Sequence, residues 1–148
     1  VLDTNIIVGY IIGAGYAKYI EKKYGAFLPP NYSVMSIVSI GEIRSLAMQF
    51  GWKSRRLEDL QNLLDKIPSI NLHPDILSKY AEMDAYSQGK HPDKKPPAGT
   101  TSRNMGKNDL WIASTAAVLN YTLLTTDSDF THLNGVFLQV IKIDPNLP

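Results

Sequence analysis

The stretch Asn108-Asp-Leu-Trp-Ile-Ala-Ser-Thr-Ala-Ala-Val-Leu-Asn-Tyr-Thr-Leu-Leu-Thr-Thr-Asp127 decides the fold class. Small apolar residues from Ile112 to Ala117 recur at helical spacing, and their size allows a helix to pack closely on a sheet. The run 122–125 then predicts a short strand. A helix that leads directly into a buried strand is one unit of an alternating α/β fold.

The rest of the chain repeats this alternation. Further strands are predicted at the start of the chain, where the first ends at Asp3, and at 33–36, 69–72 and 140–143. Helices are predicted over 6–10, 16–24, 39–50, 57–67 and 74–88, and after a cap at Asn108. Strands that alternate with helices favour a parallel sheet with right-handed crossovers. We therefore expect residues 1–148 to form a single domain, a three-layer α/β sandwich with a central parallel β-sheet.

The composition describes an ordinary globular domain, with 148 residues, 44% hydrophobic and 20% charged. Because cysteine is absent, disulfides, thiol catalysis and thiolate metal sites are excluded. No apolar run reaches the roughly 18 residues of a membrane span and no signal peptide is visible, so we expect a cytoplasmic protein. A first strand of about five residues would need more chain before Val1, so we expect native residues to precede it.

Four carboxylates lie where a predicted strand ends or a predicted helix begins, at Asp3, Glu42, Asp109 and Asp127. In an open parallel sheet the carboxyl ends of the strands converge on one crevice. Carboxylates in one crevice repel each other and are costly to desolvate unless a cation joins them. All-oxygen ligands suit hard divalent ions, Mg²⁺ or Mn²⁺. We therefore predict that these four acids are metal ligands and catalytic residues.

Taken one by one, the same acids have simpler explanations. Asp3 is a good helix cap, and Asp127 fits an ordinary turn. Glu42, expected in the first turn of its helix, and Asp109 are both favourable to a helix dipole without any function. Jointly, however, these explanations leave the recurrence of acids at four junctions unexplained, which favours the metal site.

Four further residues are predicted to support the acids. Thr4 can cap the first helix, and Asn5 can hold a metal-bound water. Thr125 can donate a hydrogen bond to a ligating carboxylate. Asp129 can cap a short helix that leads into Phe130, or hold an outer water.

Basic residues gather in one segment although the net charge is only +1. Between Gly89 and Lys107 five basic residues face one acid, and prolines and glycines predict a mobile loop. A solvated surface would explain such a segment, but a polyanionic substrate at an acidic metal site also needs cations beside it. The predicted phosphate contacts are Lys94, Lys95, Arg103 and Lys107.

With these residues in place, the chain resembles the PIN-domain ribonuclease family over essentially its whole length. The similar blocks, in the family's order, are Leu2-Asp-Thr-Asn5, Ser39 with Glu42, Asn108-Asp-Leu-Trp-Ile-Ala113 and Leu124-Thr-Thr-Asp-Ser-Asp-Phe130. In size and layout the chain is similar to the VapC-type toxins of bacterial toxin–antitoxin pairs. The resemblance implies a Mg²⁺- or Mn²⁺-dependent endoribonuclease that leaves 5′-phosphates. It also implies a homodimer and a small antitoxin that blocks the site.

Three other interpretations remain. The first is a PIN nuclease that processes RNA outside a toxin system. The second is a catalytically inactive PIN-like scaffold for protein or RNA, which the retention of four repelling acids disfavours. The third is a phosphoryl-transfer domain, either a receiver or a haloacid-dehalogenase-like phosphatase. The latter needs a second aspartate where Asn5 stands, and the receiver's acidic pair and late lysine are also missing.

Overall fold

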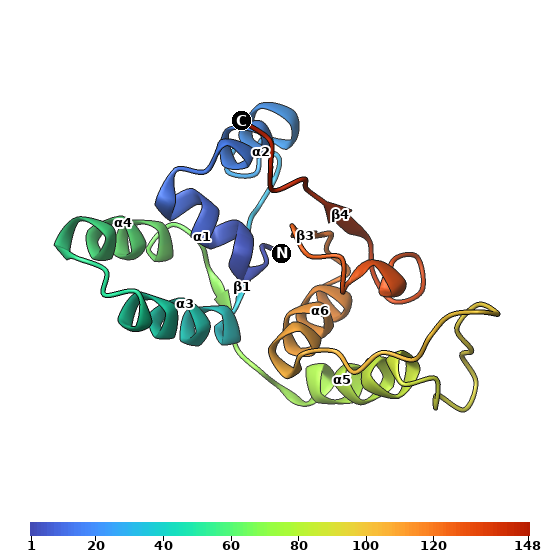
Figure 1. The fold of residues 1–148 in the computed structure, drawn as a ribbon. Helices are drawn as coiled ribbons and strands as arrows, with labels where there is room; N and C mark the ends of the chain where they lie inside the picture. Colours follow the sequence, from blue (N-terminus) through green and yellow to red (C-terminus); the bar gives the residue numbers. More distant parts are fainter.

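Short parallel strands form the central layer of the computed structural model, which describes residues 1–148 (Figure 1). β1 (Met35–Ser36) pairs with β2 (Ser69–Ile70), and β3 (Leu123–Thr125) pairs with β4 (Val140–Lys142). Both pairs are parallel. The predicted α/β fold with parallel strands is therefore confirmed, although each strand is only two or three residues long.

The first three residues join the two strand pairs into one layer. Leu2 forms a parallel bridge with Leu124, and the N–H of Asp3 donates to the carbonyl of Leu124 at 3.0 Å. On the other side, the N–H of Leu2 donates to the carbonyl of Val34 at 2.9 Å. The order across the layer is therefore β2, β1, the N-terminal segment, β3 and β4. This order places the carboxyl end of the N-terminal segment, at Asp3, in the middle of the layer.

Successive strand residues face opposite sides of this layer, as the pleat of a β-strand requires. Val1 and Leu123 belong to a core cluster built with α5 and α6, whereas Leu2 and Leu124 pack with α1 to α4. Two hydrophobic cores thus flank the strands. Figure 1 shows α1 and α2 on one side of the strands and α5 and α6 on the other. The layers are helix, sheet and helix.

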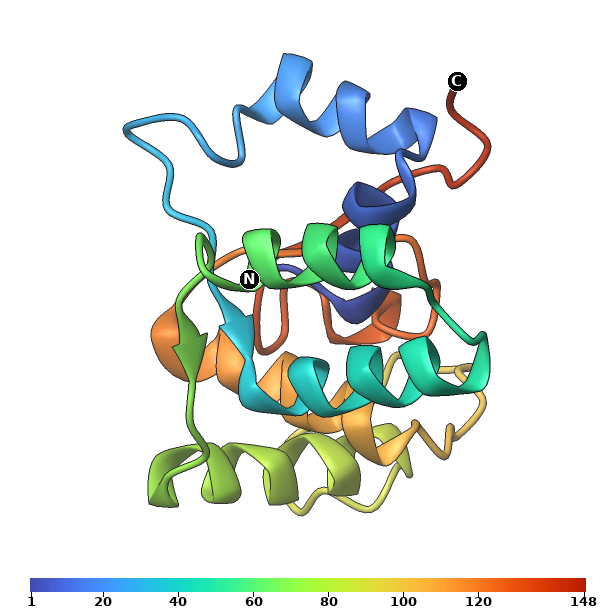
Figure 2. The ribbon, with the colours of Figure 1, turned by 90° about the vertical axis from the view of Figure 1, so that its left-hand side faces the viewer.

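Six α-helices and one 3₁₀ helix cover the strands. They are α1 (Thr4–Ile12), α2 (Gly15–Tyr24), α3 (Ile37–Gln49), α4 (Ser54–Leu64), α5 (Pro74–Ser87), α6 (Lys107–Leu119) and η1 (Thr131–Leu133). α3 and α4 lie side by side (Figure 2). None of these helices combines the length and the apolar character that crossing a bilayer requires.

Several predicted helix bounds were wrong: α4 spans Ser54–Leu64 rather than 57–67, and the starts of α3 and α6, which bear on the site, also differ. α3 begins at Ile37 because the Ser36 hydroxyl accepts a hydrogen bond from the N–H of Val38 at 3.3 Å. Glu42 consequently lies beyond the first turn, and the helix dipole does not explain it. α6 begins at Lys107 with Gly106 at the cap position, so Asn108 lies inside the helix and does not cap it.

The segment 88–106 links α5 to α6 without a helix or strand of its own, as predicted (Figure 1). It is nevertheless attached to the domain. The N–H of Arg103 donates to the carbonyl of Ser87 at 2.7 Å, and the side chains of His91 and Met105 are buried. Its basic residues are therefore presented from a loop with fixed points.

Substitution of Phe130 tests the packing of the core, because this side chain is fully buried beside the predicted site. Phe130→Ala is expected to lower the free energy of unfolding by about 3–5 kcal/mol, through lost burial and the cavity it leaves. Phe50, with 69% of its surface exposed, is the matched control, and Phe50→Ala should change the same quantity by less than about 0.5 kcal/mol. Urea denaturation followed by circular dichroism measures both. Equal losses in the two variants would contradict this packing.

Candidate active site

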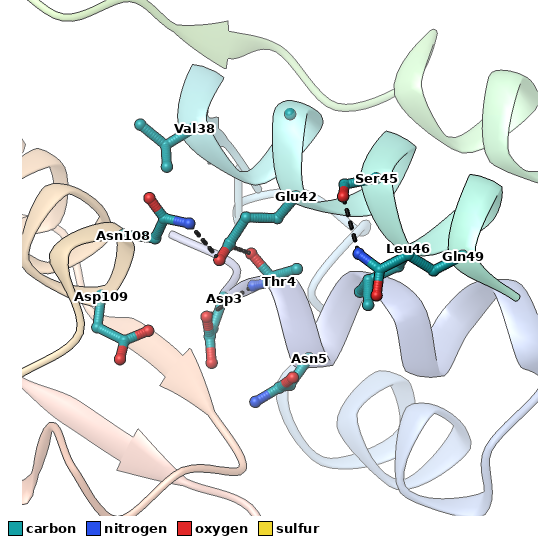
Figure 3. Close-up of a pocket in the computed structure, with 11 residues that line it drawn as sticks. Asp3, Thr4, Asn5, Val38, Glu42, Ser45, Leu46, Gln49, Asn108 and Asp109 are labelled. Carbon is teal, nitrogen blue, oxygen red and sulfur yellow. Dashed lines mark hydrogen bonds between the residues drawn. The ribbon is translucent and has the colours of Figure 1, made fainter.

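A cavity of about 610 Å³ lies where the amino ends of α1 and α6 meet the side of α3 (Figure 3). Its lining is Asp3, Thr4, Asn5, Val38, Gly41, Glu42, Ser45, Leu46, Gln49, Asn108 and Asp109. Three of the four predicted acids therefore come together from three distant parts of the chain. Asp3 and Asp109 point toward the same open space, with Glu42 beyond Asp3.

Asp3 is an almost fully buried carboxylate, with 2% of its surface exposed. One of its oxygens accepts the N–H of Thr4 at 2.7 Å, and the other accepts the hydroxyl of Thr125 at 2.6 Å. Burial raises the pKa of Asp3 to about 6, the two hydrogen bonds oppose that rise, and the negative charges of Glu42 and Asp127 add to it. The predicted role of Thr125 as a donor to a site carboxylate matches this contact.

Both oxygens of Glu42 are held by hydrogen bonds. The Thr4 hydroxyl donates to one at 2.5 Å, and the Asn108 side-chain amide donates to the other at 2.7 Å. These contacts tie α3 to α1 and to α6. Sequence reasoning missed the role of Asn108, because this contact spans 66 residues and leaves no local signal.

Asp109 stands in the first turn of α6. Burial raises the pKa of its carboxyl to about 7, and the charges of Asp3, Asp127, Glu42 and Asp129 raise it further in that order. The close approach of this side chain depends on the residue before the helix. A Cβ atom at Gly106 would lie 2.6 Å from the Asp109 Oδ2, so any larger residue would displace the carboxylate.

Asp127 does not line the cavity, but it stands next to it. Its N–H donates to the Thr125 hydroxyl at 2.9 Å, and its Oδ1 accepts the N–H of Asp129 at 2.8 Å. Its charge acts on the pKa of both Asp3 and Asp109. The Thr125 hydroxyl connects Asp127 to the buried Asp3, because it accepts the N–H of the first and donates to the carboxylate of the second.

Of the residues predicted to support the acids, Asn5 borders the cavity and Asp129 does not. The Asn5 side chain borders the cavity and makes no hydrogen bond, while its carbonyl accepts the Tyr16 hydroxyl at 2.9 Å. Asp129 does not cap a helix, because η1 has no side-chain cap. Its carboxylate instead lies 3.9 Å from the Arg103 guanidinium.

None of the four predicted phosphate contacts lines the cavity. The Lys94 ammonium lies 3.6 Å from a Glu82 oxygen and 4.3 Å from the centre of the Phe137 ring. The Lys95 ammonium donates to the carbonyl of His91 at 3.3 Å. Both side chains are thus folded onto the protein.

The other two basic residues stand nearer to the acids. Lys107 begins α6, two positions before Asp109, and its ammonium lies 3.8 Å from an Asp84 oxygen. Arg103 reaches Asp129 and through it the turn that carries Asp127. Two of the four basic residues are therefore connected to the acids, Lys107 along α6 and Arg103 through Asp129.

The donor set of the cavity consists of carboxylate, amide and hydroxyl oxygens, without a basic side chain to offset the acids. Burial is the main cause of the raised pKa values of Asp3 and Asp109, and the unbalanced negative charge adds to it. Oxygen donors with excess negative charge fit a hard divalent cation. No three acidic or imidazole groups, however, are gathered tightly enough to enclose an ion as they stand.

A helix–sheet–helix domain with an acidic cavity at the carboxyl ends of parallel strands is the class that the fold and site define. The model of the PIN domain family matches residues 1–136, and the chain belongs to the PIN-domain family. The predicted resemblance is confirmed.

Solved structures agree over nearly the whole chain. A chain of VapBC2 from Rickettsia felis, bound to a DNA fragment from their promoter, is 22% identical with a TM-score of 0.72, over 95% of this chain and 96% of that one. A chain of VapBC-1 from nontypeable Haemophilus influenzae is 27% identical with a TM-score of 0.69, over 95% of both chains. VapBC-5 from Mycobacterium tuberculosis is 21% identical with a TM-score of 0.61, over 96% of both chains. No curated protein sequence matches this chain.

The raised pKa values predict that, in EDTA, stability falls as pH rises. The unfolded chain ionises Asp3 and Asp109 near 3.8, whereas the folded chain retains these protons to about 6 and 7. The folded state binds more protons between these values, so stability is lost from about pH 4 to pH 7. We expect the melting temperature in EDTA to be higher at pH 5 than at pH 8, with the lowered pKa of the Val1 ammonium, about 6, partly opposing this trend above pH 6.

Asp109→Asn should reduce that dependence, and Asp59→Asn on the exposed face of α4 is the control that should retain it. Scanning calorimetry at matched ionic strength measures all three proteins. A melting temperature that rises steadily to pH 8 would contradict the raised pKa values of Asp3 and Asp109.

Thr125→Val tests the support of Asp3, since it removes the hydroxyl but preserves the shape. The lost hydrogen bond favoured the ionised carboxylate, so the pKa of Asp3 should rise above its value of about 6. Carbon-13 NMR titration of the aspartate carboxyl groups measures the change. Thr131→Val, at a hydroxyl bonded only to the Ser128 carbonyl, is the control and should leave the Asp3 titration in place.

Proposed function

We propose that this chain is a VapC-type toxin that hydrolyses RNA phosphodiester bonds with the help of Mg²⁺ or Mn²⁺. One observation carries the proposal: three acids from distant segments meet in a single cavity, beside a fourth, without a basic group to offset them. Such an arrangement is costly for folding alone, and its cost is removed when a divalent cation binds.

The residues proposed to hold the cation are Asp3, Glu42, Asp109 and Asp127. When bound, a divalent ion in such a site lowers the pKa of water and neutralises the charge on phosphorus oxygens. The chain's own task is to orient the ligands. Thr125 and Thr4 hold Asp3, and Thr4 also holds Glu42 together with Asn108. Asn5, whose amide is unbonded, borders the cavity where it can position a water.

Proton release accompanies cation binding in this proposal. Because the pKa values of Asp3 and Asp109 are about 6 and 7, the cavity retains protons close to neutral pH. Those protons leave when the carboxylates become ligands, so affinity for the cation declines as pH falls. Activity should follow the same trend.

Of the four basic residues predicted to contact phosphate, Lys94, Lys95, Arg103 and Lys107, the last two are proposed to attract the phosphates of the RNA most strongly, because the ammonium groups of Lys94 and Lys95 already have partners on the protein. All four belong to the segment that leads into α6 and to Asp109. Their contribution is electrostatic and independent of base sequence, so it governs affinity more than the choice of cleavage site.

The proposed partner is a small antitoxin, because the similar solved chains come from VapBC complexes and cover this chain almost entirely. This likeness favours a toxin over an RNA-processing PIN nuclease. A homodimer that acts in the cytoplasm completes the proposal. Sedimentation velocity of the purified chain tests the dimer.

Cleavage of a pool of single-stranded and transfer RNA tests the activity. The wild-type protein is expected to cut with Mg²⁺ or Mn²⁺, to stop in EDTA, and to leave 5′-phosphates. Asp3→Asn should lower the rate at least about a hundredfold, because it removes one charge from the ligand set. The control Asp59→Asn should cut like wild type.

Calorimetric titration with Mn²⁺ separates the possible failures. Tight binding that Asp3→Asn weakens, together with no cutting of this pool, would point to a highly selective target. Neither binding nor cutting would refute the four-acid site and favour a scaffold.

A further inference from the structure

We propose that a second cavity, beside the acidic one, binds a backbone phosphate of the RNA strand through Arg103 and Lys90. This inference rests on the proposed function, because it assigns a place to the substrate of that same site. The cavity measures about 360 Å³ and has no hydrophobic residue in its lining. Its residues are Gln88, Lys90, Ser102, Arg103 and Asn104.

This lining is rich in donors and has no carboxylate. The Arg103 guanidinium makes no hydrogen bond within the chain, since the nearest acidic oxygen, on Asp129, lies at 3.9 Å, too far for one. The Lys90 ammonium donates only to the side chain of Gln88, at 3.3 Å. A planar guanidinium with free N–H groups beside an ammonium is suited to phosphate oxygens.

Asp129 is the one acid that competes for Arg103. Both side chains are substantially exposed, 44% for Arg103 and 60% for Asp129, and exposed ion pairs contribute little free energy. A phosphate offers more acceptor oxygens in a bidentate geometry. The existing pair therefore orients the guanidinium without occupying it.

The second cavity lies next to the acids along two routes. Asp129 contacts Arg103 on one side and donates its N–H to Asp127 on the other. Along the chain, five residues separate Arg103 from Asp109. These contacts connect Arg103, through Asp129, to the turn that carries Asp127, and a strand with one phosphate among the acids would bring a further phosphate to Arg103 by passing this turn.

The backbone behind this cavity is fixed. The N–H of Arg103 donates to the carbonyl of Ser87 at 2.7 Å, where α5 ends. Ser87 is buried, and its hydroxyl is hydrogen-bonded to Nε2 of His132 at 2.7 Å. The base of the Arg103 side chain is therefore positioned before any ligand arrives, which reduces the entropy lost on binding.

The same geometry separates Arg103 from Lys94 and Lys95, which carry equal charge in the same loop. Lys94 lies over the Phe137 ring and Lys95 donates to a backbone carbonyl, so both ammonium groups already have partners. Lys90, by contrast, was not among the phosphate contacts predicted from the sequence. Two double variants, one at Lys90 and Arg103 and the other at Lys94 and Lys95, therefore give a matched comparison.

The experiment measures binding of the full chain to a fluorescein-labelled single-stranded RNA of mixed sequence, about twelve nucleotides long, by fluorescence anisotropy in EDTA. The Lys90→Ala/Arg103→Ala double variant should bind at least about fivefold more weakly and lower the slope of log affinity against log salt by about 1.4, the value for two phosphate contacts. The Lys94→Ala/Lys95→Ala double variant removes the same charge and should lose less than about twofold. Arg103→Lys should retain part of the affinity.

Equal losses in the two double variants would overturn the inference, since they would reduce the effect to net charge. Failure of wild type to bind the RNA would overturn it as well. Thermal melting of each variant shows that it is folded. Cleavage is measured separately with Mn²⁺. If the wild-type protein cuts RNA but Lys90→Ala/Arg103→Ala binds RNA without loss of affinity, only this inference is refuted. Selective loss of binding in a chain that never cuts supports it and refutes the proposed hydrolysis.

Discussion

The buried carboxylate of Asp3 is the constraint on which the rest of the structure depends. Burial of an acid is unfavourable unless hydrogen bonds stabilise it, and Asp3 obtains them from Thr4 and Thr125. Thr125 reaches it only because Leu2 pairs in parallel with Leu124. The pairing that sets the strand register therefore also brings Thr125 to Asp3, and a slip in pairing would remove this support of the site.

Glu42 extends this dependence to the helices. Its two hydrogen bonds join α3 to α1 and to α6, at the same place where the negative charges repel. The chain thus uses neutral donors, a hydroxyl and an amide, to hold acids together without neutralising them. A basic side chain at a donor position would neutralise the acids and occupy the place of a cation. Retaining negative charge costs stability but leaves the cavity able to bind a cation.

The sequence predicted well those features that depend on local patterns. Helical spacing and capping residues indicated all six α-helices, though not their exact bounds, and positions at a strand end and at a helix start indicated that Asp3 and Asp109 share one crevice. Contacts between distant residues left no such pattern. The cap at Ser36 moved the start of α3, and nothing near Asn108 indicates its bond to Glu42. The directions of long basic side chains also depend on tertiary neighbours, as the stacking of a lysine on Phe137 illustrates.

The opposite charges of the two neighbouring cavities constrain how a polyanion can approach. Acids around Asp109 repel a phosphate, whereas the polar cavity at Arg103 attracts one. Without a cation these effects oppose each other across the Asp127–Asp129 turn. A cation among the acids reverses the first effect, so both cavities then favour the same strand. Cation and RNA should consequently bind with positive cooperativity, because each lowers the electrostatic cost of the other.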